Sequence, residues 1–300
     1  MLIAHLSDLH LRDGGDVAWL DRQLVHIAAR KPSHLAVTGD LLDRWDAGLL
    51  TQALDRFTAH RLLNSDSLTI LHGNHDLASS GGHPRERGDL LRLLVRFWDP
   101  PPLVARRRRL FLSMIDARAR GVASATPFLK TLKDGARIAV LDTVPAPWQP
   151  VSYSHGSLTV RHAIGCVRKE EAAWLSRQTG SGPLLLLTHH YPLQVQPFVW
   201  TPESRVLQSR WLSGLRGVVR EVCVPMEIIP ADRELLWDAA QKATVRLVLC
   251  GHLHRARLEW HSRIAVGLNG QSGAAWAGRT VAFYEISERD VTMDLWNAEN

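Results

Sequence analysis

The chain has 300 residues, a formal net charge of +6 and 45% hydrophobic residues, which is typical of a globular protein with a core of useful size. Its three cysteines are widely spaced and form no CxxC pair, which argues against a disulfide framework or a zinc ribbon and favours a reduced, cytoplasmic setting. The apolar runs are too short to span a bilayer, and no signal peptide is predicted. The positive charge suits a phosphate-bearing partner or an anionic surface without choosing between them.

Short apolar runs predict buried strands along the chain, at residues 2–6, 35–37, 68–71, 137–141, 184–187 and 245–249. Between the early runs, residues 18–29 and 49–62 place apolar side chains on one helical face. Three further runs, at residues 264–268, 281–286 and 291–296, predict antiparallel strands at the end of the chain. The early alternation of strand and helix predicts a layered α/β fold.

Two stretches interrupt this alternation, at about residues 78–135 and 194–232. The first contains DPPPLVARRRRLFLSMIDARARG, and the second is rich in Trp, Arg and Pro. We expect both to be excursions from the sheets within a single domain of residues 1–300, because no linker or repeat divides the chain.

Polar side chains follow five of the predicted strands, at the point where each strand ends. The stretches are SDLH (residues 7–10), TGDLLD (38–43), HGNHD (72–76), THHYP (188–192) and CGHLH (250–254). Because sites in open α/β sheets collect outside the carboxyl ends of strands, we expect these stretches to converge. Asp8 and His10 should face the same way, since alternate residues of an extended chain do so, and Leu9 should point into the packing.

The candidate ligands offer carboxylate, imidazole and one amide oxygen, and they are Asp8, His10, Asp40, Asn74, His189, His252 and His254. This donor set suits Mn, Fe or Zn and excludes a site selected by thiolates. Seven donors are too many for one tetrahedral ion but suit two ions that share a carboxylate. Two such ions lower the pKa of a shared water and clamp the oxygens of a phosphate. A glycine precedes three of the ligands, where a tight turn brings the backbone close to the site.

The five motifs in this order resemble the calcineurin-like metallophosphoesterase family, whose pattern is DxH, GD, GNHD, a histidine at a strand end, and GHxH. The match runs from Asp8 to His254 and so covers most of the chain. The resemblance implies two packed mixed β-sheets flanked by helices, a four-layer sandwich with an inserted cap or lid. It also implies metal-dependent hydrolysis of a phosphoester by a metal-bridging hydroxide.

The resemblance further implies a role for each matching residue. One ion would be held by Asp8, His10 and His254, the other by Asn74, His189 and His252, and Asp40 would bridge them. His75 would lie over the substrate phosphate and protonate the leaving oxygen or stabilise the charge, and Asp76 would orient His75 by accepting its second N–H. The family pattern selects His189 over His190 as the ligand, which leaves His190 to contact substrate or to pack.

An intact His75 favours substrates with poor leaving groups, and hence phosphodiesters. The leading hypothesis is a phosphodiesterase or pyrophosphatase of a small molecule, such as a cyclic nucleotide or a nucleotide-linked lipid precursor like UDP-diacylglucosamine. The typical bacterial pyrophosphatases that this last interpretation resembles, however, carry Arg at the position of His75, so this chain departs from them there. The alternatives are a DNA-processing nuclease of the same superfamily, which the basic charge suits, and a non-catalytic scaffold, although no expected ligand is missing.

The arginine run at residues 106–109 has two interpretations. It is a solvated helix face, or it binds phosphate or the inner face of a membrane with help from the neighbouring apolar residues. In the second case Arg106 and Arg107 are candidate substrate contacts, and the segment is a lid over the site. Elsewhere, Asp43 and His72 are expected to support the site, and His5 is expected to be a core histidine.

Overall fold

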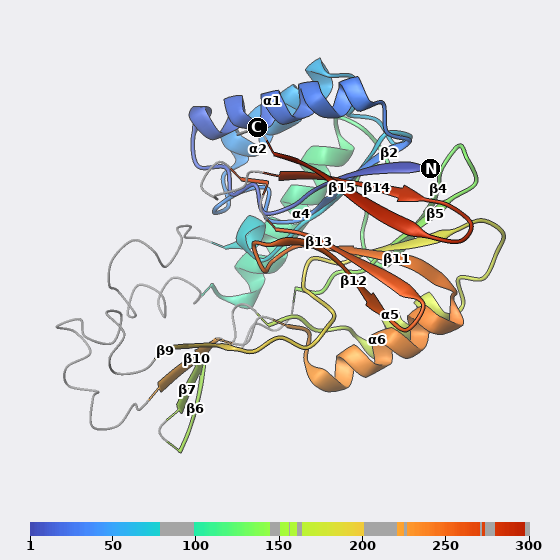
Figure 1. Cartoon of the computed structure of the whole chain (residues 1–300). Coiled ribbons are helices and arrows are strands. Elements are labelled where there is room, and N and C mark those ends of the chain that lie inside the picture. The colour runs from blue at the N-terminus through green and yellow to red at the C-terminus, as the bar shows by residue number, and fades with distance from the viewer. Residues whose placement is uncertain are drawn as a thin grey trace.

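The computed structural model describes residues 1–78, 99–144, 151–155, 157–160, 164–200, 221–224, 227–270, 272–273 and 280–297 (Figure 1). The elements, in chain order, are β1 (Leu2–Leu6), α1 (Gly14–Arg30), β2 (His34–Thr38), α2 (Ala47–Ala59), β3 (Leu68–Leu71), the 3-10 turn η1 (His75–Leu77), α4 (Pro101–Asp116), β4 (Phe128–Thr131), β5 (Arg137–Val140), β6 (Val151–Ser154), β7 (Ser157–Val160), α5 (Lys169–Ser176), β8 (Leu184–Leu187), β9 (Phe198–Trp200), β10 (Glu221–Val224), α6 (Pro230–Lys242), β11 (Val245–Cys250), β12 (Ala256–His261), β13 (Ile264–Asn269), β14 (Thr280–Ile286) and β15 (Val291–Asn297).

Two mixed sheets form the centre of the fold. The five-stranded sheet has the order β15-β14-β1-β2-β3, and the six-stranded sheet has the order β12-β13-β11-β8-β5-β4. Strands β1, β2 and β3 are parallel, as are β5, β8, β11 and β13. The remaining strands of the two sheets, β14, β15, β4 and β12, pair antiparallel with their neighbours. Figure 1 shows α1 and α2 on the outer side of the first sheet and α5 and α6 on the outer side of the second. The predicted four-layer fold is therefore confirmed.

Strand β8 shows why an uninterrupted apolar run suits this architecture. Successive side chains of a strand point to opposite faces of the sheet. Leu184 and Leu186 pack against the α5–α6 layer, and Leu185 and Leu187 pack between the two sheets. Both faces of the central strands are covered, so these strands gain by being apolar at every position.

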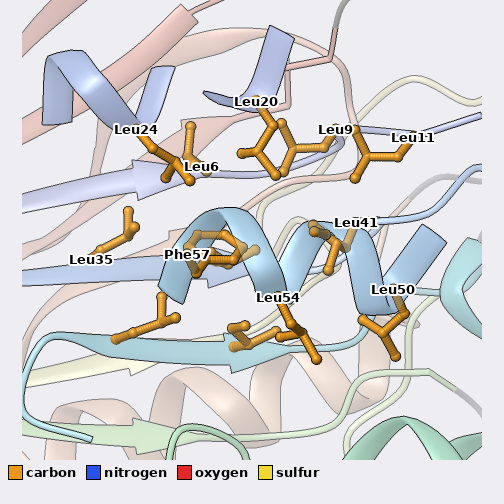
Figure 2. Packing of buried hydrophobic residues seen from close by; sticks show 14 of the residues in the cluster. Leu6, Leu9, Leu11, Leu20, Leu24, Leu35, Leu41, Leu50, Leu54 and Phe57 are labelled. Atoms are coloured by element: carbon orange, nitrogen blue, oxygen red, sulfur yellow. The ribbon is translucent and has the colours of Figure 1, made fainter. Parts of the chain in front are cut away.

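Helices α1 and α2 cover the five-stranded sheet with a stripe of leucines and one phenylalanine (Figure 2). Each helix starts at an aspartate whose carboxylate accepts two backbone N–H groups, Asp13 for α1 and Asp46 for α2. Such a cap satisfies donors that have no partner inside the helix, and it is worth about 1 kcal/mol. The caps place both helix starts ahead of the predicted residues 18 and 49, where the apolar periodicity begins.

The predicted excursion at residues 78–135 is too long, because α4 and β4 belong to the body of the fold. Phe111 and Ile115 of α4 are fully buried in the core beneath α1 and α2, and β4 pairs with β5 at the edge of the six-stranded sheet. Successive helical residues are 100° apart, so the arginine run wraps around α4 and cannot form one cationic face. Of this predicted excursion, residues 79–98 lie outside the described residues.

The second predicted excursion contains strands that the sequence analysis did not predict. Strands β9 and β10 join β6 and β7 in a separate four-stranded sheet of order β6-β7-β10-β9, which lies apart from the two large sheets in Figure 1. This excursion ends where α6 begins at Pro230, and its residues 201–220 and 225–226 lie outside the described part. The single-domain organisation expected for residues 1–300 stays a prediction.

No helix among the described residues is both long and apolar enough to cross a membrane. None of the three cysteines, all of which lie in the described part of the chain, forms a disulfide, and Cys250 is buried at the end of β11.

Candidate metal centre

The predicted ligands all follow parallel strands, at the carboxyl edges of the two sheets. Asp8 and His10 come after β1, Asp40 after β2 and Asn74 after β3, so the first sheet delivers these four at one end. The remaining three come from the second sheet, where β8 leads to His189 and β11 leads to His252 and His254. The two edges meet, and the predicted convergence of the motifs is confirmed by the contacts that follow.

A first cluster is formed by Asp8, His10 and His254, whose ligand atoms all lie within 4.8 Å of one another. The Nε2 atoms of His10 and His254 are 3.2 Å apart, and Nε2 of His254 is 3.2 Å from Oδ1 of Asp8. Two imidazole nitrogens and a buried carboxylate oxygen that converge at these distances are the donor types that divalent metal ions bind. The cluster therefore suits a positive ion.

A second cluster gathers Asn74, His189 and His252. Nε2 of His189 is 2.9 Å from Oδ1 of Asn74 and 3.2 Å from Nδ1 of His252. The other ring nitrogen of His189, Nδ1, lies 2.8 Å from the carbonyl oxygen of Thr38, which leaves Nε2 to face the cluster. A backbone carbonyl in this position fixes the tautomer and the orientation of a ligating imidazole.

Asp40 lies between the two clusters. Its Oδ2 atom is 3.4 Å from Nε2 of His189 and 3.7 Å from Nε2 of His10. The Oδ2 atom is buried and accepts no hydrogen bond from the described residues, whereas Oδ1 accepts the backbone N–H of His75 at 2.8 Å. A buried carboxylate oxygen without a partner is costly, so this position calls for a cation and fits a bridging ligand.

The pKa values of the histidines in the two clusters also indicate a site for positive charge. Burial lowers the pKa of His10, but the nearby carboxylates of Asp43 and Asp8 outweigh it and raise that pKa to about 10. Burial likewise lowers the pKa of His189, yet the charge of Asp40 raises it to about 9. The carboxylates of the site thus favour positive charge beside Asp40. In contrast, burial and then His189 lower the pKa of His252 to about 3.

The backbone at the ligands is strained, which the sequence analysis did not foresee. Five predicted ligands have positive φ: Asp8 (55°), His10 (45°), Asp40 (50°), His252 (74°) and His254 (50°). Residues other than glycine rarely adopt this left-handed region, and each case costs on the order of 1 kcal/mol or more. Asp8 and His10 therefore share a side of the site because of two left-handed turns after β1, and the expectation of an extended SDLH segment is wrong. Leu9 between them is buried in the core, as predicted (Figure 2).

Two glycines allow the strands to approach this closely. A Cβ atom on Gly73 would lie 2.2 Å from Oδ1 of Asp40, and one on Gly251 would lie 2.3 Å from Oδ2 of Asp8. Both distances are well inside van der Waals contact, so the carboxylates occupy the space that a side chain would need. Gly73 directly precedes Asn74, and Gly251 directly precedes His252. The prediction that glycine brings the backbone close to the site at these two positions is confirmed.

A comparison with known families places this site in context. The family model described as calcineurin-like phosphoesterase matches residues 1–256, which include every predicted ligand. The chain belongs to the calcineurin-like phosphoesterase family. It is therefore a metal-dependent hydrolase of phosphoric esters, as the sequence predicts.

Solved structures share the fold of this phosphoesterase at low sequence identity. A dimetal phosphatase from Danio rerio is 11% identical, with 99% of this chain and 96% of that chain covered and a TM-score of 0.57. The protein TT1561 of Thermus thermophilus is also 11% identical, with 98% of this chain and 97% of that chain covered and a TM-score of 0.52. No curated protein matches the sequence.

One contact expected from the resemblance is wrong in this phosphoesterase. Asp76 does not orient His75, because its two carboxylate oxygens accept the backbone N–H groups of Leu42 and Gly73 at 2.8 Å each. Nδ1 of His75 lies instead 2.9 Å from the carbonyl oxygen of Asp43. Asp76 thus ties the loops that carry Asp40 and Asn74 together, and burial, followed by the charge of Asp40, raises its pKa to about 7. A backbone carbonyl leaves no trace in a sequence motif, which is why the partner of His75 was missed.

The three predicted substrate contacts differ in burial, because His190 and Arg107 are buried and Arg106 is exposed. His190 is fully buried beside the second cluster, with Nδ1 2.9 Å from the hydroxyl of Thr143 and Nε2 without a hydrogen-bond partner in the described structure. Its ring centroid lies 4.5 Å from that of His252. Arg107 is buried and bonded to the carbonyl of Leu77 and to Asp99, so its guanidinium serves the fold and the prediction of a substrate contact for Arg107 is not supported. Arg106 is exposed on α4, and its substrate contact stays a prediction.

Three further predicted residues surround the site, namely His5 as a core histidine and Asp43 and His72 as its supports. His5 is fully buried, with Nε2 2.8 Å from the hydroxyl of Thr38, so it is a core histidine as predicted. Asp43 supports the site through its carbonyl, and its Oδ1 lies 3.7 Å from Nδ1 of His10. His72 is buried beside Asp142, with 3.5 Å between Nε2 and Oδ2.

Proposed function

We propose that this phosphoesterase hydrolyses a phosphodiester or pyrophosphate bond of a small molecule, such as a cyclic nucleotide or a nucleotide-linked lipid precursor. The observation that carries the proposal is the position of Asp40 between two separate ligand clusters, with His75 attached to Asp40 through its backbone N–H. This arrangement provides two ion positions and one partly exposed imidazole at the same edge of the sheets.

The donor set fits two divalent ions, and we propose Mn²⁺ as the native pair, with Fe and Zn as the other candidates. Carboxylate, imidazole and amide oxygen ligands suit these metals. Asp8, His10 and His254 would hold one ion, Asn74, His189 and His252 the other, and the free Oδ2 of Asp40 would serve both. When bound, the ions supply Lewis acidity that activates water and neutralises charge on a phosphate.

The protein's own groups hold this centre and handle a proton. The carbonyl of Thr38 orients His189, and the carbonyl of Asp43 orients His75. Because Nδ1 of His75 faces that carbonyl, Nε2 is the atom left to exchange a proton with substrate. A protonated His75 would donate from Nε2 to the leaving oxygen, and general acid catalysis of this kind contributes about 10²- to 10⁴-fold.

This role of His75 supports phosphodiesters as substrates. Hydrolysis of a diester expels an alcohol oxygen that needs a proton to leave, unless the leaving group is already acidic. We further propose a cytoplasmic location, which is supported by three cysteines that form no disulfide. Contact with a membrane surface through the apolar and arginine residues of α4 stays a prediction.

A substrate panel with Mn²⁺ tests the proposal. It compares bis-p-nitrophenyl phosphate, cyclic nucleotides, UDP-linked lipid precursors, p-nitrophenyl phosphate and DNA. Turnover of small diesters or UDP-linked precursors well above that of monoesters supports the proposal. Preferential cleavage of DNA, with binding that weakens steeply as salt rises, would identify a nuclease instead. Binding of Mn²⁺ without turnover of any ester would contradict the proposal.

A further inference from the structure

A cavity adjoins the segments that carry the metal centre. Its volume is about 220 Å³, and it is formed by the end of β3, the edge strand β4, the residues just after β5 and one face of α4. Leu71, Leu112 and Phe128 give it apolar walls. Every one of its lining residues belongs to the described part of the chain.

Three arginines line this cavity, namely Arg108, Arg109 and Arg168. Nε of Arg108 lies 3.1 Å from Oδ2 of Asp142, and Arg168 is paired with Glu171. Arg109 is exposed and has no ion pair or hydrogen bond to any residue that the structure describes. One of the three lining arginines therefore carries a charge that no described residue compensates, and both paired arginines keep further N–H donors.

His72 supplies a buried polar group to the same cavity. Its side chain is only 2% exposed, and its Nδ1 atom has no hydrogen-bond partner among the described residues. A buried ring nitrogen without a partner costs free energy. His72 thus adds a polar side chain to the wall of the cavity beside the arginines.

The cavity shares a wall with the metal centre. His72 is two residues before the predicted ligand Asn74, with only Gly73 between them. On the other side, Asp142 is followed by Thr143, whose hydroxyl lies 2.9 Å from Nδ1 of His190 beside the second ligand cluster. A molecule held in the cavity would therefore contact the segments that position both clusters.

We propose that this cavity is a second anion site, which binds an organic phosphomonoester. A phosphomonoester has three terminal oxygens that accept hydrogen bonds, and guanidinium groups match such oxygens in geometry. The apolar walls suit an apolar or aromatic body attached to the phosphate. The identity of the ligand rests on the proposed function, because a phosphomonoester is what hydrolysis of a small phosphodiester leaves. The site thus gives the reaction product a place to act on the enzyme.

Calorimetric titration of the metal-loaded protein with phenyl phosphate tests this site. Removing the free charge with Arg109→Gln is expected to weaken the binding of phenyl phosphate to the cavity about tenfold, since a hydrogen bond to a charged group is lost. The matched control is Arg263→Gln, because Arg263 is also exposed, lies in the turn between β12 and β13, and does not line the cavity. Equal affinities in these two variants would overturn the proposal.

The variant Asp40→Asn separates this site from the metal centre. Phenyl phosphate binding that persists in Asp40→Asn and weakens in Arg109→Gln is the expected result. Loss of all binding in Asp40→Asn would place phenyl phosphate on the metal centre and overturn the second site. The proposed function is tested separately by hydrolysis of bis-p-nitrophenyl phosphate by the wild-type protein, so its failure leaves the binding result unaffected.

Discussion

Asp40 and His189 meet across the two sheets, with 3.4 Å between Oδ2 and Nε2, although they are far apart in the sequence. Asp40→Asn keeps the size of the side chain but removes the charge that both clusters face. We expect the affinity for Mn²⁺ to fall by at least about 10- to 100-fold at one of the two positions, because the shared ligand becomes neutral. Calorimetry with Mn²⁺ measures this change. The control is Asp294→Asn, which alters a surface ion pair with Arg30, and an Asp40→Asn variant that matches this control would contradict the bridging role.

The role of His75 predicts a dependence on the leaving group. In His75→Gln, we expect kcat/KM for a cyclic nucleotide, which expels an alkoxide, to fall roughly 10²- to 10⁴-fold. For bis-p-nitrophenyl phosphate the loss should be much smaller, because p-nitrophenolate leaves without a proton. Steady-state kinetics on both substrates measure the difference, and His60→Gln serves as a control because His60 pairs with Asp21 outside the site. Equal losses on the two substrates would rule out the acid role.

The close approach at Gly73 predicts that even one added methyl group disturbs the centre. In Gly73→Ala the new Cβ would lie 2.2 Å from Oδ1 and 2.5 Å from the backbone nitrogen of Asp40, so Asp40 must move. We expect affinity for Mn²⁺ to fall about 10- to 100-fold, with hydrolysis reduced in parallel. Gly14→Ala is the matched control, because nothing lies within 4 Å of a Cβ at that position. Unchanged metal binding in Gly73→Ala would show that the loop relaxes without cost.

A buried histidine far from the metal centre predicts how stability depends on pH. Burial lowers the pKa of His34 to about 4, while its ring nitrogens bond the carbonyl of Asp66 and the hydroxyl of Thr69, and nearby Lys130 lowers the pKa further. Between pH 4 and 6.5 the unfolded chain binds a proton that folded His34 does not, so stability rises with pH in this window. Protonation of His34 in the unfolded chain should therefore lower the free energy of unfolding by about 2 kcal/mol when the pH falls from 7 to 5.

Urea unfolding at pH 7 and pH 5 measures this effect. The expected result is a smaller loss of stability between the two pH values in His34→Gln than in the wild-type protein, since the other buried histidines contribute equally to both. The same pH dependence in the two proteins would show that His34 is not the group responsible.

Much of the fold could be predicted because the buried strands leave direct signals. The apolar runs at residues 2–6, 68–71 and 184–187 match β1, β3 and β8 to the residue, since both faces of these strands are covered. Strand β4 was missed because its outer positions are exposed and it follows the arginine-rich segment. Helix α4 was taken for part of an excursion because its buried residues Val104, Arg107, Phe111 and Ile115 include a charged one.

The ligands of the candidate site could be predicted from the sequence, but the groups that orient these ligands could not. Motifs record side chains, so Asp8, Asp40 and His252 could be identified from the sequence. The groups that orient them are partly backbone atoms, such as the carbonyls of Thr38 and Asp43, which any residue could provide. The left-handed backbone at Asp8 and His10 was equally invisible, because these residue types do not require it.

The central claim is that Asp40 joins two metal positions in one hydrolytic centre. Its most direct test is the Mn²⁺ content of the chain after chelation and reloading, measured by mass spectrometry together with turnover of bis-p-nitrophenyl phosphate. Our account predicts two bound ions per chain, turnover that disappears with the chelator and returns with the ions, and loss of both properties in Asp40→Asn. Full turnover after complete removal of the metal, or a chain that is fully active with a single ion, would contradict it.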